Sequence, residues 1–347
     1  MILRSTFLAL LLCGLSPQHL SAQEPTAVMS LNDCMVYAVD HSYETQRAQN
    51  SLDNNKLDYT GAILDHLPSL SASVSGTTSF GRGIDPATNS YVNTSTFSNG
   101  LSSSASVPVF YGMRLLNSTR YYKISRLKGE ESLKQQQDLT AQQVMVAYAE
   151  VVYNQELVAL YQDQLESYEQ SEKLAARKYE LGNGSPTDLY EIQASVCSQQ
   201  YNVITAQNNL EQSIIKLKDL MNFPLSDSLL IEPKIPETML FDQDQELKAI
   251  TAYAQANNSS AIISEYALTQ SKLTLSIAKA SFYPSVSLWA NIYTSYYTNL
   301  DDRDITITPY ADQLSDNMGK GVGASISIPI FSGLDTRLNV QKQRNNL

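Results

Sequence analysis

Four segments of the chain alternate apolar and small polar residues, and this alternation predicts β-strands. In the first, Leu70, Ala72 and Val74 alternate with Ser71, Ser73 and Ser75. The other three run from Leu101 to Val109, from Val286 to Ile292 and from Val322 to Ile330. A period of two places apolar side chains on one side of a strand and polar side chains on the other.

The length of these strands also fits a membrane. A tilted strand of about ten residues spans a bilayer, and aromatic residues gather where such strands meet the membrane surface. Aromatic residues stand at both ends of the third segment: Phe282, Tyr283, Tyr293, Tyr296 and Tyr297. A soluble sandwich with a solvated Ser-rich face is the alternative, and four strands in two matched pairs favour the membrane.

Between the two strand pairs, apolar and small residues recur every three or four positions. The first run predicts a helix from about Arg114 to Leu181, on the order of 100 Å long, and the second begins at Pro186. Alternating spacings of three and four indicate a coiled-coil seam, and an ordinary helical hairpin inside a bundle is the alternative. The predicted seam positions are Ala147, Val151, Asn154, Val158, Tyr161, Leu165 and Tyr168, then Leu189, Ile192, Val196, Gln199, Val203, Ala206, Leu210, Ser213, Leu217 and Leu220.

The segment between these helices has the residues of a tight turn. Gly182 and Gly184 suit the left-handed end of a helix, Ser185 suits the N-cap of the next, and Pro186 suits its first position. Asn183, Thr187 and Asp188 complete this tip. A role in capping and turn geometry alone is the alternative to a functional role for these residues.

The chain repeats itself. The sequence around Pro68 returns around Pro284, and the segment from Pro108 to Gly112 returns from Pro329 to Gly333. The offsets are about 216 and about 221 residues, so one duplicated unit fits both matches. We expect a first repeat over residues 23–223, a linker over 224–244, and an incomplete second repeat over 245–347.

The N-terminus has the pattern of a secretory signal peptide over residues 1–22, with an apolar run from Phe7 to Cys13 and small residues before Gln23. Lipid modification of Cys13 is the alternative, but Leu12 stands where the processing enzyme needs a small residue. Cys34 and Cys197 lie far apart and indicate neither a disulfide nor a metal framework.

Charge and motif content argue against nucleic acid and catalysis. The net charge of −11 repels phosphate. The three histidines have no metal-ligand spacing, and no Gly-rich loop follows a strand in nucleotide-binding form. Asp301, Asp302 and Asp304 indicate a solvated loop rather than a calcium site. We expect no enzyme, metal or cofactor.

These segments together resemble the TolC-type outer-membrane efflux proteins. The resemblance rests on the order of elements, which begins with a helix from Leu31 to Leu64 after the signal. It also rests on the strand entries at Pro68 and Pro284, the exits ending at Gly112 and Gly333, and the tip. It implies a mainly α protein with membrane β-strands: a long coiled-coil hairpin barrel plus four transmembrane strands per chain, contributing to a trimeric twelve-strand β-barrel. Independently, four strands are too few to close a barrel, so other chains must complete the edges.

The resemblance also implies function and place. A homotrimer in outer-membrane lipid, extending into the Gram-negative periplasm, would form a passive export duct for small molecules or polypeptides. A periplasmic adaptor and an inner-membrane pump would act with it, and the adaptor would dock at the tip. The residues carried over are Gly182, Asn183, Gly184, Ser185, Thr187 and Asp188 at the tip, and Pro68, Pro108, Gly112, Pro284, Pro329 and Gly333 at strand-helix junctions.

The second repeat departs from the pattern. A repeat equal to the first would continue to about residue 444, whereas the given sequence ends at Leu347. The expectation is therefore a truncated product or an incomplete sequence of a family member, and a second chain that supplies the missing part is the alternative. In function, a non-functional remnant of the family is one alternative. A barrel-forming outer-membrane protein without an efflux role and a periplasmic coiled-coil scaffold are the others.

Overall fold

A computed structural model describes residues 28–85, 89–233, 247–301 and 308–347. The predicted signal peptide with Cys13, and the acidic residues Asp302 and Asp304, lie outside these ranges. Residues 234–244 of the predicted linker also lie outside them.

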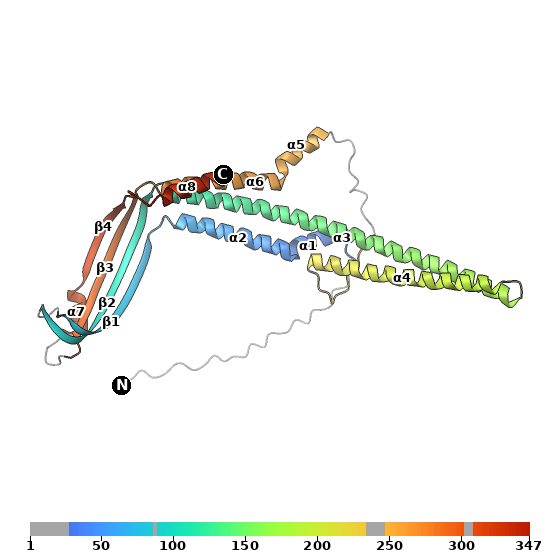
Figure 1. The fold of residues 1–347 in the computed structure, drawn as a ribbon, viewed down its shortest axis with the longest axis horizontal. Helices are drawn as coiled ribbons and strands as arrows, with labels where there is room; N and C mark the ends of the chain where they lie inside the picture. Colours follow the sequence, from blue (N-terminus) through green and yellow to red (C-terminus); the bar gives the residue numbers. More distant parts are fainter. Residues whose placement is uncertain (1–27, 86–88, 234–246, 302–307) are drawn as a thin grey trace. The chain divides into compact units, whose positions relative to one another are not determined.

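The described residues are mainly helical and contain four strands, as the sequence predicts. Figure 1 shows the elements in order. They are α1 (Leu31–His41), α2 (Tyr43–Leu64), β1 (Ser69–Asp85), β2 (Ser90–Tyr111), α3 (Arg114–Glu180), α4 (Pro186–Met221), α5 (Leu247–Asn257), α6 (Ser259–Ala280), β3 (Ser285–Asn299), α7 (Tyr310–Asp316), β4 (Gly319–Ser327) and α8 (Asp335–Asn345).

The same series of elements occurs twice. Helices α1 and α2 have 11 and 22 residues, and α5 and α6 have the same lengths. Before α3 the backbone passes through two left-handed residues, Gly112 (φ 60°) and Met113 (φ 67°). Gly333 (φ 61°) and Leu334 (φ 70°) do the same before α8. The duplication therefore extends to backbone conformation, including a non-glycine residue in a costly region.

The residues form two compact units, each drawn from two stretches of sequence. The first comprises the described residues between 28 and 43 and between 139 and 233, and the second those between 44 and 138 and between 247 and 347. Helix α3 contributes to both, because position 139 lies within it.

The core of the first unit joins α1, the second part of α3 and the end of α4. Its fully or almost fully buried members are Leu31, Cys34, Ala38, Val144, Ala147, Tyr148, Val151, Leu217 and Met221. Ser30 begins α1 with a capping box: its Oγ accepts from the Asp33 N–H, and the Asp33 carboxylate accepts from the Ser30 N–H. Hydrogen bonds from the Ser30 hydroxyl and the Ser30 N–H to the Asp33 carboxylate lower the pKa of Asp33. The Tyr148 hydroxyl donates to the Glu232 carbonyl, which ties the segment after α4 to this core.

The predicted seam is confirmed along α4, where every predicted position is buried or partly buried. On α3 the seam is buried at Ala147, Val151 and Asn154, whereas Tyr168, near the tip, is 43% exposed. Part of the contact is polar, since Gln199 Nε2 donates to Gln164 Oε1 at 2.8 Å. The two helices are thus most tightly packed away from the tip.

The second unit contains a four-stranded antiparallel sheet in the order β1-β2-β3-β4. The register aligns Leu70 with Ala105, Ala105 with Ala290, and Ala290 with Val322. One face is therefore apolar across all four strands, as predicted. The opposite face carries hydroxyl groups that pair between strands, with Ser71 and Ser104 Oγ atoms 2.9 Å apart and Ser73 and Ser102 Oγ atoms 2.7 Å apart.

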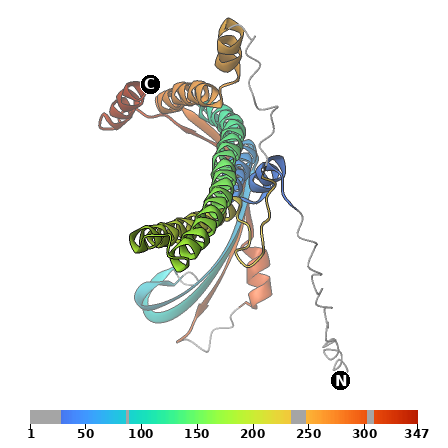
Figure 2. The same ribbon diagram turned by 90° about the vertical axis from the view of Figure 1, so that its right-hand side faces the viewer.

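Helices of the second unit pack beside α3. The Asn55 side chain of α2 accepts from Ser125 Oγ at 3.0 Å, and Lys128 Nζ donates to Gln270 Oε1 of α6 at 3.4 Å. Helix α8 lies next to α6, as Figure 2 shows.

Three expectations need correction. The predicted helix over residues 31–64 breaks at Ser42, whose φ of −64° and ψ of 143° are extended. Strand β4 ends at Ser327 rather than continuing to Ile330, because its partner β3 begins at Ser285, which pairs with Ser327. Pro329 also lacks a donor for further pairing. The first two strands are longer than predicted, because polar residues on both faces hide the alternation beyond Phe80 and before Leu101.

The aromatic residues at the end of the third strand do not all lie on the face where an aromatic band was expected. Tyr296 lies on the apolar face, where its ring is 6.4 Å from Phe97 and 4.8 Å from Tyr310. Tyr293 and Tyr297 have the opposite parity and lie on the hydroxyl face. They therefore do not belong to an aromatic band on the apolar side.

Helix α7 covers the edge of β3 that β4 does not reach. Gln313 Oε1 accepts from the Tyr297 N–H at 3.1 Å, and Gln313 Nε2 donates to the Tyr297 carbonyl at 3.1 Å. Asn317 Nδ2 donates to the Ser295 carbonyl at 2.7 Å. Side-chain amides thus replace the missing strand, which blocks further pairing along this edge.

Replacing Leu217, which is fully buried in the first unit, by Ala should lower the free energy of unfolding by about 2–5 kcal/mol. The control is Ile204→Ala on the same helix, where the side chain is 56% exposed and the change should stay within about 0.5 kcal/mol. Denaturant unfolding followed by circular dichroism measures both. Equal losses in the two variants would contradict the assigned core.

The two described cysteines should differ in reactivity. Cys34 is fully buried, and burial raises the pKa of its thiol to about 11, so near neutral pH it stays protonated. Cys197 is exposed. Maleimide labelling of the folded protein, mapped by mass spectrometry, should modify Cys197 and spare Cys34 until denaturant is added.

Candidate functional site

The tip between α3 and α4 is built by backbone hydrogen bonds and one side-chain cap. The Asn183 N–H donates to the Lys178 carbonyl at 2.9 Å, and the Gly182 N–H donates to the Tyr179 carbonyl at 2.9 Å. Gly182 is left-handed with φ 75°. This pattern ends α3 as the sequence predicts.

Ser185 then begins α4. Its Oγ accepts from the Thr187 N–H at 3.1 Å, and Pro186 follows at the first helical position. Asp188 lies in the first turn, where a negative charge is favourable to the helix dipole. The structure therefore brings all six predicted tip residues into one exposed turn.

Gly184 is not left-handed, contrary to the expectation, and the turn requires glycine there for a different reason. A Cβ atom at Gly184 would lie 2.9 Å from the Tyr179 nitrogen and 3.1 Å from the Lys178 carbonyl carbon. Both are backbone atoms, which have little freedom to yield. The turn therefore closes only with glycine at this position.

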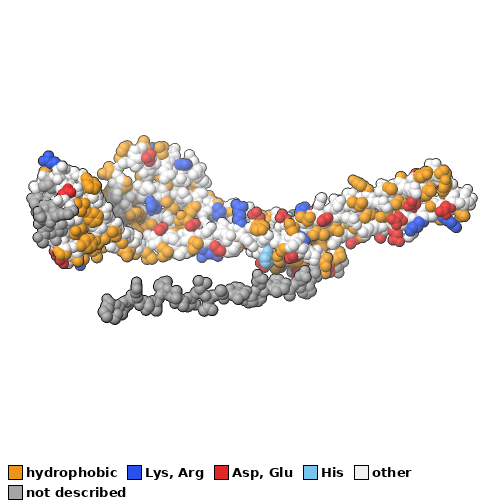
Figure 3. Space-filling view, turned by 90° about the horizontal axis from the view of Figure 1, so that it is seen from below, with side chains coloured by type: hydrophobic (Ala, Val, Ile, Leu, Met, Phe, Trp, Pro, Cys, Tyr) orange, Lys and Arg blue, Asp and Glu red, His pale blue; other side chains and the backbone are white. Residues whose placement is uncertain are grey.

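The surface of the tip is unusually apolar for a solvated turn. Four large side chains near it are exposed: Leu174 (58%), Tyr179 (48%), Leu181 (62%) and Tyr190 (69%). In Figure 3, hydrophobic side chains appear on the surface at the tip end of the hairpin, at the right of the view. A patch of this kind is typical of a surface that another protein covers.

The predicted junction residues lie at the ends of strands. Pro68 and Pro284 immediately precede β1 and β3. Pro108 stands at a β-bulge in β2, where the register shifts between Pro108 and Phe110. Gly112 follows β2 in the left-handed conformation, and a Cβ atom there would lie 2.6 Å from the Ala280 carbonyl oxygen.

The last two junction residues lie beyond the end of β4. Pro329 is in the segment between Ser327 and α8, outside any strand, and Gly333 has φ 61° before α8. Tip and junction residues are thus two separate groups, one in each compact unit.

The apolar face of the sheet is open. Exposed fractions are 78% for Leu70, 74% for Val74, 46% for Leu288, 50% for Ile292 and 85% for Val322. No other part of the described chain covers these side chains, so this face needs an apolar environment outside the chain.

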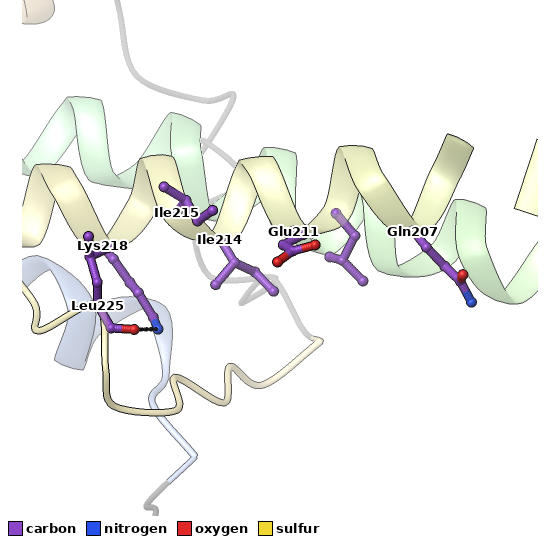
Figure 4. A pocket seen from close by; sticks show the side chains of 7 residues that line it. Gln207, Glu211, Ile214, Ile215, Lys218 and Leu225 are labelled. Carbon is purple, nitrogen blue, oxygen red and sulfur yellow. Dashed lines mark hydrogen bonds between the residues drawn. The ribbon is translucent and has the colours of Figure 1, made fainter. Parts of the chain in front are cut away.

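A groove of about 410 Å³ lies on α4 in the first unit. Leu210, Ile214, Ile215 and Leu225 give it apolar walls, and Gln207, Glu211 and Lys218 complete the lining (Figure 4). The Lys218 ammonium group is engaged by the loop after α4: Nζ donates to the Asp227 carbonyl at 2.6 Å and to the Leu225 carbonyl at 3.4 Å.

Among the described residues, no helix has an apolar stretch long enough to cross a membrane. The same part of the chain holds no group of three acidic, His or Cys side chains suited to a metal ion.

Sequence reasoning missed two features of the second unit. The amides of Gln313 and Asn317 complete the β3 edge, and nothing in the local sequence indicates this role. The position of Trp289 on the hydroxyl face could have been predicted from the sequence, because Trp289 alternates in step with Ser287 and Asn291. Extending the alternation to aromatic residues would have found it.

Comparison with known proteins decides the family. Residues 40–222, more than half of the chain, match the model of the family described as outer membrane efflux protein. The chain belongs to the outer membrane efflux protein family. It is therefore an outer-membrane protein.

Two curated relatives agree with this assignment. The alkaline protease secretion protein AprF of Pseudomonas aeruginosa is 24% identical over 228 residues, which cover 63% of this chain and 44% of AprF. The outer membrane efflux protein BepC of Brucella suis is 20% identical over 274 residues, which cover 79% of this chain and 55% of BepC. The chain thus spans about half the length of these relatives.

Solved structures show the same fold. The CmeC outer membrane channel of Campylobacter jejuni matches with a TM-score of 0.73 and 19% identity, over 91% of this chain and 65% of CmeC. CusC matches with a TM-score of 0.72 and 19% identity, over 91% of this chain and 69% of CusC.

Replacing Gly184 by Ala should open the tip, because the added methyl group meets backbone atoms of Lys178 and Tyr179. We expect a local cost of about 1–3 kcal/mol, seen as roughly tenfold or faster hydrogen exchange over residues 178–190. Gly61→Ala in α2 is the matched control: no atom lies within 4 Å of its added Cβ, so the helix should gain about 0.5–1 kcal/mol. Unchanged exchange in the Gly184 variant would contradict the tight turn.

Proposed function

We propose that this chain is a subunit of a passive export duct in the outer membrane, without enzymatic activity. The observation that carries the proposal is the sheet, whose apolar face is exposed on β1, β3 and β4 and partly buried on β2, while hydroxyl groups pair on the other face. Such a sheet suits lipid on one side and water on the other.

The free edges of the sheet support an assembly. Strands β1 and β4 are the outer strands, and each has one hydrogen-bonded neighbour among the described strands. Open edges in a membrane leave backbone groups unpaired, which is costly. Three chains, each giving four strands, would close a twelve-strand barrel, and this homotrimer is the assembly we propose.

The helical hairpin would continue the duct into the periplasm. Its seam includes small and polar residues, such as Ala206, Ser213 and Gln199, which suit helices packed side by side around a space rather than a tight dimer. We propose that residues 23–223 and 245–347 are two repeats of one unit, joined by a linker over 224–244 and preceded by a signal peptide over 1–22. The matching lengths of α1–α2 and α5–α6 support this division.

The tip is the proposed docking site for a periplasmic adaptor, which would couple the duct to an inner-membrane pump. Its exposed apolar side chains and rigid turn support this role. Gly182, Gly184 and Ser185 hold the shape of the turn, whereas Asn183, Thr187 and Asp188 offer polar groups to a partner. The junction residues Pro68, Pro108, Gly112, Pro284, Pro329 and Gly333 would set where strands pass into helices.

For the cargo, we propose only the class of molecule: polypeptides or small molecules. AprF is described as a protease secretion protein and BepC as an efflux protein, so polypeptides and small molecules are both represented among the relatives.

A pair of neighbouring substitutions tests the membrane sheet. Val74→Arg places a charge on the apolar face, where the side chain is 74% exposed, and should cost about 2–4 kcal/mol near the bilayer centre. Ser73→Arg places the same charge one residue away on the hydroxyl face. We expect an SDS-resistant trimer in outer membranes for the wild type and the Ser73 variant, and a strong loss for the Val74 variant.

The controls separate assembly from expression. Total protein in whole cells is measured for all three chains, and the trimer fraction is compared at equal amounts. Equal losses in both variants, or a wild type that forms no trimer in membranes, would count against the duct.

A further inference from the structure

Two aromatic rings stand on the hydroxyl face of the sheet. Trp289 and Tyr293 of β3 are 41% and 53% exposed. On β2 their neighbours are Ser106 and Ser102, and on β4 they are Gly323 and Gly319. Both rings therefore have small residues on either side.

Glycine on β4 lets these rings lie directly against the strand. A Cβ atom at Gly323 would lie 2.6 Å from Cζ2 of Trp289, and one at Gly319 would overlap the Tyr293 ring. At Gly321, between them, a Cβ atom would lie 3.3 Å from Cζ3 of Trp289. The rings cover the positions that side chains of β4 would occupy, and their outer surfaces stay open.

This face is also uncharged. Across residues 69–79, 96–106, 285–297 and 319–327, the side chains with this parity come from Ser, Thr, Asn, Gly, Trp and Tyr. Lys320 has the opposite parity and belongs to the apolar face. Fixed charges on this part of the sheet therefore neither attract nor repel a solute.

An exposed aromatic ring recognises solutes by stacking and by its electron-rich face. A flat aromatic molecule stacks on such a ring, and a positive charge over the ring adds attraction. The net charge of −11 also favours cations near the chain. Serine hydroxyl groups beside the rings offer hydrogen bonds to polar edges of the same molecule.

We propose that Trp289 and Tyr293 form a stacking platform for planar aromatic cations. The inference rests on the proposed function, since the hydroxyl face becomes the inside of the duct only in the closed barrel. Three chains would then place three platforms at one level, and the duct would favour flat aromatic cargo over aliphatic cargo of equal charge.

The chain provides its own reporter, because Trp289 is its single tryptophan. Ethidium, a planar aromatic cation, is titrated into the purified full chain in detergent while tryptophan emission is recorded. Tetraethylammonium, an aliphatic cation, is the matched solute. We expect saturable quenching by ethidium and no response to tetraethylammonium.

Variants show which surface binds. Tyr293→Leu and Gly323→Val should each weaken ethidium binding by about tenfold, the first by removing a ring and the second by displacing Trp289 from β4. Ile292→Leu is the control, because this residue lies between the rings in sequence but on the apolar face. Ethidium fluorescence anisotropy gives the affinities, and circular dichroism confirms folding of each variant.

The outcomes separate this inference from the duct itself. Saturable quenching that the Tyr293 and Gly323 variants lose supports the platform, whether or not the chain forms a membrane trimer. A membrane trimer without ethidium quenching leaves the duct standing and overturns the platform. Equal responses to both cations, or equal losses in the Ile292 control, overturn it as well.

Discussion

The register of the four strands is the constraint on which the rest of this structure depends. Side chains alternate between faces, so a slip of one residue would exchange the apolar and hydroxyl faces completely. The observed register places Leu70, Ala105, Ala290 and Val322 in one row. It also pairs serine hydroxyl groups across β1 and β2. Every functional statement about the sheet, including which side meets lipid and where Trp289 points, follows from that alignment.

The helical hairpin depends on packing between helices rather than on strand register. A helix of 67 residues such as α3 gains its stability from packing rather than from intrinsic propensity alone. Near α1 it has a well-buried core around Tyr148 and Leu217, whereas toward the tip the seam residues become partly exposed. The tip itself is held by turn geometry, with glycine where the backbone approaches too closely for a side chain. A well-defined turn at the end of a loosely packed helix pair suits a surface to which a partner protein binds.

Much of this architecture was predictable because its signals are local and periodic. The long helix was expected from about Arg114 to Leu181 and runs from Arg114 to Glu180. The tip residues, the strand entries and the apolar face also follow from spacing and turn chemistry. The break at Ser42 and the early end of β4 were not predictable in this way, because the second depends on where a partner strand begins. The roles of the tip and junction residues in transport remain predictions.

The sequence by itself determined the period of each segment, the duplication and the chemistry of the turn. The periods and the turn chemistry arise from residues within a few positions of one another, and the duplication follows from comparing two stretches of the same sequence. None of them requires a contact between distant parts of the folded chain. The tertiary structure decided which residues meet across strands and helices: the rings of Trp289 and Tyr293 against glycines of β4, and the amides of Gln313 and Asn317 along the β3 edge. These contacts join residues from different elements, and only the folded backbone sets the distance between them.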